Sequence, residues 1–334
     1  MAVRLKDIAR DLGVSVVTVS KVLRGNTDIS DETRKRVLKR MNELNYQPNM
    51  MARGLASGRT YTVGLVVPDL VHPFFAEFAK SLSGVLRAAD RALILASSEE
   101  DPEIEQKEIR TLLRRGVDVL LIASCQARLR NFYDLGDRTP YVLFDRNFPH
   151  LAAHYVGSDD VRVGEMATRH LIELGRTRIA HIGGKNTSPS LDRLEGFRKA
   201  MAEARLPVSE AHVVAKERME ETGDLVGFAA MQDLLRTKPR PDAVFCYNDL
   251  TAVGAIESVL EAGLRVPEDV AVIGCGNFRY AGYLKVPLSS IDHGVAELGR
   301  IAGELALDLS IRPEQPPKSV LLTPTLVVRR STGG

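Results

Sequence analysis

Hydrophobic residues follow two different periods along this chain, and the period changes near residue 60. Over the first 46 residues they recur every three or four positions, which is the spacing of one face of an amphipathic helix. The segment "LKDIARDL" is the first example, with Leu5, Ile8, Ala9 and Leu12 on a single stripe. Gly13 then ends the pattern. A first short helix is therefore predicted between Leu5 and Leu12.

Two more helices are predicted before residue 46. In "SVVTVSKVLRG" Ser15 can cap a helix whose inward face carries Val19, Val22 and Leu23. In "ISDETRKRVLKRMNELNY" Ser30 is the cap, and the core positions are Val37, Met41 and Leu44. Three short helices, the first two joined by a glycine-containing turn, indicate a helix-turn-helix domain over residues 1–46.

The outward face of the second helix predicts contact with DNA. A helix-turn-helix lays its second helix in the major groove, with the N-terminal residues against base edges. Val16 and Val17 stand there, and their methyl groups suit the C5-methyl of thymine, while Lys21 can donate to guanine or to phosphate. The alternative is that the valines pack against a helix of another protein. The residues of this domain expected to meet DNA are Leu5, Ser15, Val16, Val17, Thr18, Ser20, Lys21 and Arg24.

The balance of charge also changes near residue 60, where the hydrophobic period changes. Residues 1–60 hold 12 basic and 6 acidic residues, a net charge of +6, whereas the remainder holds 33 basic and 37 acidic residues, a net charge of −4. A basic N-terminal part on a mildly acidic body indicates a polyanionic partner for the N-terminal part alone.

From Thr62 onward short apolar strands alternate with amphipathic helices. The runs "TVGLVVP", "ALILAS" and "VDVLLIA" make a first group, and "RIAHIGG", "AVFCYND" and "DVAVIGC" make a second. Nearly continuous apolar strands alternating with helices are typical of parallel sheets covered on both faces. The sequence therefore predicts an α/β body of two doubly wound lobes.

Polar residues gather where the predicted strands end, and open α/β sheets bind ligands at these carboxyl ends. Amides, carboxylates and guanidinium groups can grip vicinal hydroxyls, and phenylalanine can cover the CH face of a sugar. The pattern predicts a pocket for a polyol or carbohydrate, although Asp249 and Ser188 could instead simply cap helices. The candidate ligand-binding residues are Asp69, His72, Phe74, Phe75, Asp145, Arg146, Asn147, Ser188, Ser190, Arg193, Asn248, Asp249 and Asn277.

Several other classes of protein are disfavoured by what the chain lacks. No P-loop, dinucleotide fingerprint or hydrolase elbow occurs, so we expect no enzyme and no cofactor. His150 and His154 have a helical metal spacing, but Pro149 argues against a helix there, and we expect no metal. The three cysteines are too few and too far apart for a disulfide framework. With no apolar run of membrane length and no secretory signal pattern, a cytoplasmic protein is expected.

The motifs together resemble the lactose-repressor (LacI/GalR) family of bacterial transcription regulators. The most specific are "VSVVTVSKVL", "NYQPNMMARGL" and "FCYND", and the likeness is colinear from about Leu5 to Arg330. It implies a homodimeric, sequence-specific repressor on a palindromic double-stranded DNA operator in the bacterial nucleoid, whose operator affinity a small molecule modulates allosterically. Its implied fold is an all-α helix-turn-helix headpiece plus an α/β bilobed, periplasmic-binding-protein-like body. A solute-binding protein for transport is a rival function, and residues 5–57 and the missing signal-peptide pattern argue against it.

The resemblance also divides the chain. Residues 47–60 become a hinge that folds on DNA, with Leu55 as the residue inserted between base pairs and Asn49, Ala52 and Arg53 as minor-groove contacts. From composition alone the same stretch reads as a flexible linker. The body, residues 61–330, divides into a first lobe of about 61–158 plus 292–318 and a second of about 159–291 plus 319–330.

Within the body, Arg146, Arg193 and Asn248 match family positions that contact effectors. In "GCGN" Gly276 replaces an aspartate that usually grips an effector hydroxyl. Similarly, Lys21 stands where the family usually has arginine, so the bidentate fork is lost. We expect a sugar or sugar derivative as effector, and the alternatives of an atypical or phosphorylated sugar, a non-sugar or a protein corepressor stay open.

Overall fold

The computed structural model describes residues 3–23, 26–46, 54, 58–126, 139–148, 150–220 and 222–334. The chain separates into two compact units, residues 1–60 and 61–334. In the part of the chain that is described, no helix is both long and apolar enough to span a membrane.

The first unit contains three short helices, α1 (Leu5–Leu12), α2 (Val16–Leu23) and α3 (Asp31–Glu43). Their inward faces are the predicted ones, because Ile8, Val19 and Val37 are fully buried together in one small core. Gly13 closes α1 in the left-handed conformation, with a φ of 66°. Arg40 of α3 forms an ion pair at 2.6 Å with Asp11 of α1, which ties the third helix to the first. The predicted helix-turn-helix is confirmed.

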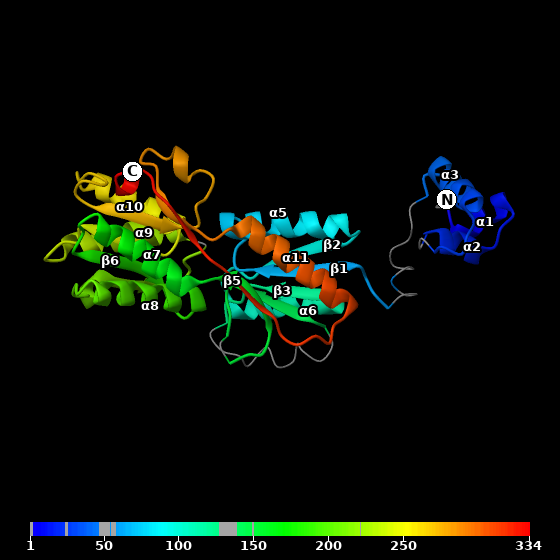
Figure 1. The fold of residues 1–334 in the computed structure, drawn as a ribbon, viewed down its shortest axis with the longest axis horizontal. Coiled ribbons are helices and arrows are strands. Elements are labelled where there is room, and N and C mark those ends of the chain that lie inside the picture. The colour runs from blue at the N-terminus through cyan, green and yellow to red at the C-terminus, as the bar shows by residue number, and fades with distance from the viewer. Residues whose placement is uncertain are drawn as a thin grey trace. The chain divides into compact units, whose positions relative to one another are not determined.

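The second unit consists of two lobes, each a six-stranded, largely parallel sheet with helices on both faces (Figure 1). In the first lobe the strand order is β11-β5-β4-β3-β1-β2, and in the second it is β12-β10-β9-β8-β6-β7. The direction of winding reverses at β1 and at β6, because the next strands along the chain lie on opposite sides of them. These are the switch points at which such sheets bind ligands.

The strands of the first lobe are β1 (Thr62–Val67), β2 (Ala92–Ser97), β3 (Val119–Ile122), β4 (Tyr141–Phe144), β5 (His154–Ser158) and β11 (Ser319–Leu322), and its helices are α5 (Pro73–Ala88), α6 (Pro102–Arg114) and α11 (Val295–Ile311). The strands of the second are β6 (Ile179–Gly184), β7 (Val213–Lys216), β8 (Ala243–Cys246), β9 (Ala271–Cys275), β10 (Ser289–Asp292) and β12 (Thr325–Val327). Its helices are α7 (Asp160–Glu173), α8 (Ser188–Glu203), α9 (Gly223–Arg236) and α10 (Asp249–Glu261), with 3-10 turns at Glu210–His212, Ala281–Tyr283 and Arg330–Thr332.

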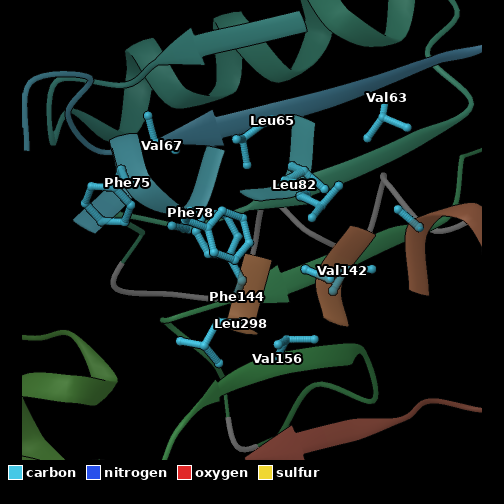
Figure 2. Packing of buried hydrophobic residues seen from close by; sticks show 14 of the residues in the cluster. Val63, Leu65, Val67, Phe75, Phe78, Leu82, Val142, Phe144, Val156 and Leu298 are labelled. Atoms are coloured by element: carbon cyan, nitrogen blue, oxygen red, sulfur yellow. The ribbon is translucent and has the colours of Figure 1, made fainter. Parts of the chain in front are cut away.

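The core of the first lobe lies between the sheet and the helix pair α5 and α11 (Figure 2). Phe78 of α5 stacks on Phe144 of β4, with ring centroids 4.0 Å apart and planes 9° from parallel. Burying an aromatic side chain of this size contributes about 1.5–3 kcal/mol. Helix α6 covers the opposite face through Ile109 and Leu112. Both faces of the sheet are thus buried, which is why its strands are apolar throughout.

The second lobe is built in the same way. One face of its sheet packs against α9 and α10, and the other packs against α7 and α8. Successive residues of β8 show the division, since Val244 and Cys246 join the first of these cores while Ala243 and Phe245 join the second. Side chains alternate across a strand, so a sheet covered on both faces needs apolar residues at every position.

The border between the lobes differs from the predicted one near the C-terminus. Residues 319–330 were expected in the second lobe, but β11 pairs in parallel with β5, from Ser319 against Tyr155 to Leu322 against Ser158, in the sheet of the first lobe. Just before β11, the backbone N–H of Lys318 donates to Nδ1 of His154 at 3.2 Å. The chain therefore crosses between lobes after β5, after β10 and after β11, and the last crossing lies at residues 323–324.

Candidate functional site

Helix α2 of the first unit presents the outward face that the sequence predicted. Ser15 caps it, since its Oγ accepts a hydrogen bond from the backbone N–H of Thr18 at 3.0 Å. Val19 and Val22 are buried, whereas Val16 and Val17 are 45% and 60% exposed. Two β-branched apolar side chains thus remain in water at the start of a short helix.

Lys21, on the same helix, forms an ion pair with Asp28 of the following turn. The hydrogen bond from Lys21 lowers the pKa of the Asp28 carboxyl below its ordinary value. The ammonium group lies toward the turn after α2, and the ion pair remains exposed to solvent. Asp28 was not among the residues expected to matter, because its proximity to Lys21 depends on the turn after α2.

The remaining candidates for DNA contact divide into two groups. Leu5 and Ser20 are partly buried, and Leu5 packs against the small core. Thr18 is partly buried and its hydroxyl is hydrogen-bonded to that of Ser15 at 2.9 Å. The other candidates, Arg24, Asn49, Ala52, Arg53 and Leu55, lie outside the described residues.

In the second unit a cavity lies between the lobes, at the carboxyl ends of their strands. Its volume is about 20 Å³, enough for a single water molecule. Six of the predicted ligand-binding residues line it: His72, Phe74, Phe75, Asp145, Arg193 and Asn248. The other lining residues were not predicted; they are Glu220, Tyr247, Cys275, Gly276, Phe278 and His293.

A buried carboxylate, that of Glu220, joins the two lobes at this cavity. Its Oε1 accepts hydrogen bonds from Nη2 of Arg146 and from the hydroxyl of Tyr247, both at 3.0 Å. Its Oε2 lies 3.1 Å from Nε2 of His72 and 3.4 Å from Nδ2 of Asn248. Burial would raise the pKa of Glu220, but the positive charge of Arg146, together with hydrogen bonds from Tyr247 and Arg146, holds that pKa below its ordinary value.

Arg193, on α8, is held by three partners within the second lobe. Its Nε donates to Oδ1 of Asp160 at 2.7 Å, its Nη1 donates to the carbonyl of Tyr247 at 2.6 Å, and its guanidinium carbon stands 4.7 Å from the centre of the Tyr247 ring. Nη2 also lies 3.4 Å from Nε2 of His293. Arg193 and Asp160 are both buried, so this ion pair depends on having each of its partners.

Three further titratable groups on the cavity wall have pKa values shifted by their surroundings. Burial raises the pKa of Asp145 to about 7, although the adjacent Arg146 opposes this. The Cys275 thiol lies 2.9 Å from Nε2 of His293. Burial raises the pKa of that thiol and lowers that of His293, so the pair is a neutral thiol and a neutral imidazole.

Seven predicted residues do not line the cavity. Arg146 donates a hydrogen bond to the lining residue Glu220, and Asn147 donates its backbone N–H to Oγ of Ser188 at 2.9 Å across the lobes. Ser190 is bonded to the hydroxyl of Thr187 at 2.7 Å. The side chains of Asp69, Asp249 and Asn277 hold nearby loops through the N–H of His72, the N–H of Phe278 and the carboxylate of Asp292, respectively. Asp249 is not the cap of α10, the alternative role considered for it, because Asn248 caps that helix.

Some of the unpredicted wall residues carried a sequence signal and one did not. Tyr247, Cys275 and His293 each stand at the carboxyl end of a strand, where the same rule that found Asn248 applies. Glu220 stands in the loop between β7 and α9, four residues beyond the end of its strand. Nothing in the local pattern distinguishes it from the other acidic residues of "KERMEETGD".

Each of the two units matches a known protein family. Residues 4–49 match the family described as bacterial regulatory proteins, lacI family, and residues 168–332 match the periplasmic binding protein-like domain. The ribose operon repressor of Haemophilus influenzae is 35% identical over 98% of this chain and 98% of its own length. The HTH-type transcriptional regulator DegA of Bacillus subtilis is 32% identical over 99% of this chain and 98% of its own length.

A solved structure of similar length shares the same architecture. The structure of a transcriptional regulator CelR-cellobiose complex is 31% identical, covers 98% of this chain and 99% of its own, and superposes with a TM-score of 0.74. Identity at this level, sustained from the first helix of the DNA-binding unit to the end of the second lobe, establishes homology. The chain is a DNA-binding transcription regulator rather than an enzyme, and it belongs to the lacI family of bacterial regulatory proteins.

Proposed function

We propose that this regulator is a repressor that binds a palindromic operator as a homodimer and that a sugar or sugar derivative, bound between its lobes, sets its affinity for that operator. The observation that carries the proposal is the presence in one chain of an exposed apolar helix face and a buried polar cavity shared by two lobes. The names of its relatives support it, since one is a ribose operon repressor and one solved structure is a complex with cellobiose.

The DNA-binding step uses α2. Val16 and Val17 lose their contact with water when they meet thymine methyl groups in the major groove. Lys21 exchanges Asp28 for guanine or phosphate. The residues of the hinge, Asn49, Ala52, Arg53 and Leu55, take the minor groove as the family resemblance implies. A repressor of this kind acts in the bacterial cytoplasm, on the nucleoid.

The ligand-binding step uses the cavity. A cavity of about 20 Å³ cannot hold a sugar, so the ligand binds an arrangement in which the contacts across the lobes have changed. These contacts include the one between His72 and Glu220 and the hydrogen bond from Asn147 to Ser188. A ligand that prefers one arrangement shifts the population toward it. Coupling to operator binding of about 1–3 kcal/mol would alter operator affinity by about five- to 150-fold.

The test measures both sites in the full chain. Thermal-shift screening against sugars, sugar phosphates and nucleobases identifies the ligand, and titration of a selected operator with and without that ligand measures the coupling. We expect one class of ligand to stabilise the protein and to change operator affinity. The double substitution Val16→Ser and Val17→Ser should abolish operator binding and leave the ligand shift intact. Equal operator affinity with and without a bound ligand would refute the proposal.

A further inference from the structure

The surroundings of Glu220 form a complete binding site for an anionic group. Four donors converge on its carboxylate, and we refer to His72, Arg146, Tyr247 and Asn248 together as the anion cradle. All four side chains are at most 4% exposed. Hydrogen bonds to an anionic acceptor are stronger than hydrogen bonds between neutral groups. The cradle therefore has the composition of a carboxylate or phosphate site.

The protonation of His72 agrees with this role. The Nδ1 atom accepts a hydrogen bond from the backbone N–H of Phe74 at 3.3 Å, as part of the cap of α5. In the neutral imidazole the proton then lies on Nε2, which is 3.1 Å from Oε2 of Glu220 and 3.3 Å from Nδ2 of Asn248. Desolvation by burial lowers the pKa of His72, which favours this neutral form. The histidine therefore serves as a hydrogen-bond donor to an anion.

The cradle has more donor capacity than Glu220 uses. The Nε of Arg146 is buried and has no hydrogen-bond partner among the described residues. It stands 3.7 Å from Oδ2 of Asp145, within ion-pair range but without a hydrogen bond. A buried donor left unsatisfied costs stability, and a group with three or more oxygen atoms could satisfy it.

The donors and the acceptor differ in how they are held. His72 and Asn248 cap the helices α5 and α10, and Arg146 and Tyr247 follow the ends of strands β4 and β8. Glu220 stands on the loop between β7 and α9, and its backbone N–H donates to Oε2 of Glu100 in the first lobe at 3.1 Å. The four donors are fixed by secondary structure. The carboxylate of Glu220 lies on a loop, and a movement of that loop can withdraw it from the four donors.

We propose that the effector of this regulator carries a carboxylate or phosphate group, and that this group takes the place of Glu220 in the anion cradle. The inference rests on the proposed function and narrows the effector to an acidic sugar derivative. Glu220 acts as an internal stand-in for the ligand, holding the lobes together from within until the effector displaces it.

The cradle prefers an anionic ligand to a neutral one because the two differ in how well they satisfy its buried donors once Glu220 is displaced. A neutral polyol that displaced Glu220 would remove the nearest carboxylate from the buried Arg146 and leave it only the longer contacts to Glu100 at 3.6 Å and to Asp145 at 3.7 Å, which is unfavourable. A neutral polyol that did not displace Glu220 would find no room, since the cavity is about 20 Å³. An anionic group restores the three hydrogen bonds from Arg146, Tyr247 and Asn248 and the contact with His72. A site built for a charged group therefore discriminates against the neutral analogue.

The first test asks whether the cradle accepts a free anion. Glu220→Ala removes the carboxylate, and Glu217→Ala is the matched control because Glu217 is exposed on the same loop. We expect sodium acetate or sodium phosphate to raise the melting temperature of Glu220→Ala by about 3 °C or more over sodium chloride of equal ionic strength. Glu217→Ala and the unsubstituted protein should show no such gain. Should Glu220→Ala fail to fold, Glu220→Gln keeps the shape of the side chain and should show a smaller gain in the same direction.

The second test identifies the ligand's charged group. Gluconate, glucose 6-phosphate and glucose, with the corresponding ribose series, are titrated into the full chain. We expect the acidic member of one series to bind at least about ten-fold more tightly than the neutral sugar, and Glu220→Ala to tighten it further because the internal competitor is gone. Comparison of the carboxylate with the phosphate shows which group the cradle takes.

The possible failures can be told apart. If a neutral sugar binds best and changes operator affinity, the cradle is not an anion site for the effector, while the proposed function stands. If anions stabilise Glu220→Ala no more than Glu217→Ala, the inference is likewise overturned. If neither sugars nor acidic sugars change operator affinity, the proposed function itself is wrong.

Discussion

Helix α2 leaves two valines in water, whereas the cavity between the lobes buries two arginines and several carboxylates. The ordinary distribution of side chains is reversed in both places, in opposite directions. In the first unit the exposed valines cost little, since the helix is complete without a partner. In the body a buried charge is costly unless it is paired, so the charged residues around the cavity pair with one another when no ligand is bound. The exposed face of α2 is left without a partner, whereas the anion cradle is occupied by the carboxylate of Glu220.

The largest effect that separates the two regions is expected at Arg193. Arg193→Met leaves Asp160 buried without its ion-pair partner, which should lower the free energy of unfolding by about 3–5 kcal/mol. The measurement is urea denaturation of the full chain. Arg300→Met is the control, because Arg300 forms exposed ion pairs on α11 and its loss should have no measurable effect. Equal midpoints for the two variants would show that the buried pair carries no special weight.

The next effect concerns the pH dependence of the protein's stability, to which Asp145 on the cavity wall contributes. Because the pKa of Asp145 is about 7 in the folded protein, against an ordinary 3.8, the folded state binds the proton more tightly than the unfolded state. Stability contributed by this group is therefore lost as the pH rises through that window. Asp145→Asn should remove the loss and raise stability at pH 8 on the order of 3 kcal/mol relative to the unsubstituted protein.

Asn tolerates the left-handed backbone that Asp145 adopts, with a φ of 60°, so the substitution should not strain the chain. Asp224→Asn, at an exposed position, is the control. The readout is the unfolding free energy from pH 5 to pH 8. A parallel decline in the Asp145→Asn variant and the unsubstituted protein would assign the pH dependence to other carboxyl groups.

The smallest effect is expected at α2 and concerns DNA alone. Val17→Ala should reduce affinity for the operator by about 1–2 kcal/mol, or five- to 30-fold, through lost contact with thymine methyl groups. Stability should change by less than about 0.5 kcal/mol, since the side chain is 60% exposed. Leu38 on α3 is 45% exposed, as Val16 is, and Leu38→Ala should leave operator affinity unchanged. A similar loss from both would point to a general effect on the unit.

The three helices of the first unit could be predicted from sequence because their determinants are local. The face that Val16 and Val17 share follows from the helical period, and the caps Ser15 and Ser30 follow from residue type. The pair of Lys21 with Asp28 could not be predicted in this way. It depends on the path of the turn between α2 and α3, which periodicity does not describe.

The cavity could be predicted only in part. The rule that ligands bind at the carboxyl ends of parallel strands located His72, Asp145 and Asn248 correctly on its wall. It could not separate these from Asp69 and Asp249, whose side chains accept hydrogen bonds from backbone N–H groups of their own loops. Nor could it find Glu220, since a loop residue that reaches across to the other lobe has no periodic signal. The same limit misplaced β11, whose partner strand lies more than 150 residues earlier.

The most direct test of the whole account is selection of binding sites by the full chain from random duplex DNA at physiological salt, followed by titration of the best site. The account predicts a palindromic sequence bound at least about a thousand-fold more tightly than random DNA. Its affinity should fall when Val16 and Val17 are replaced by serine. No preference for any palindrome over random DNA would contradict the account, because the exposed valines would then have no duplex to meet.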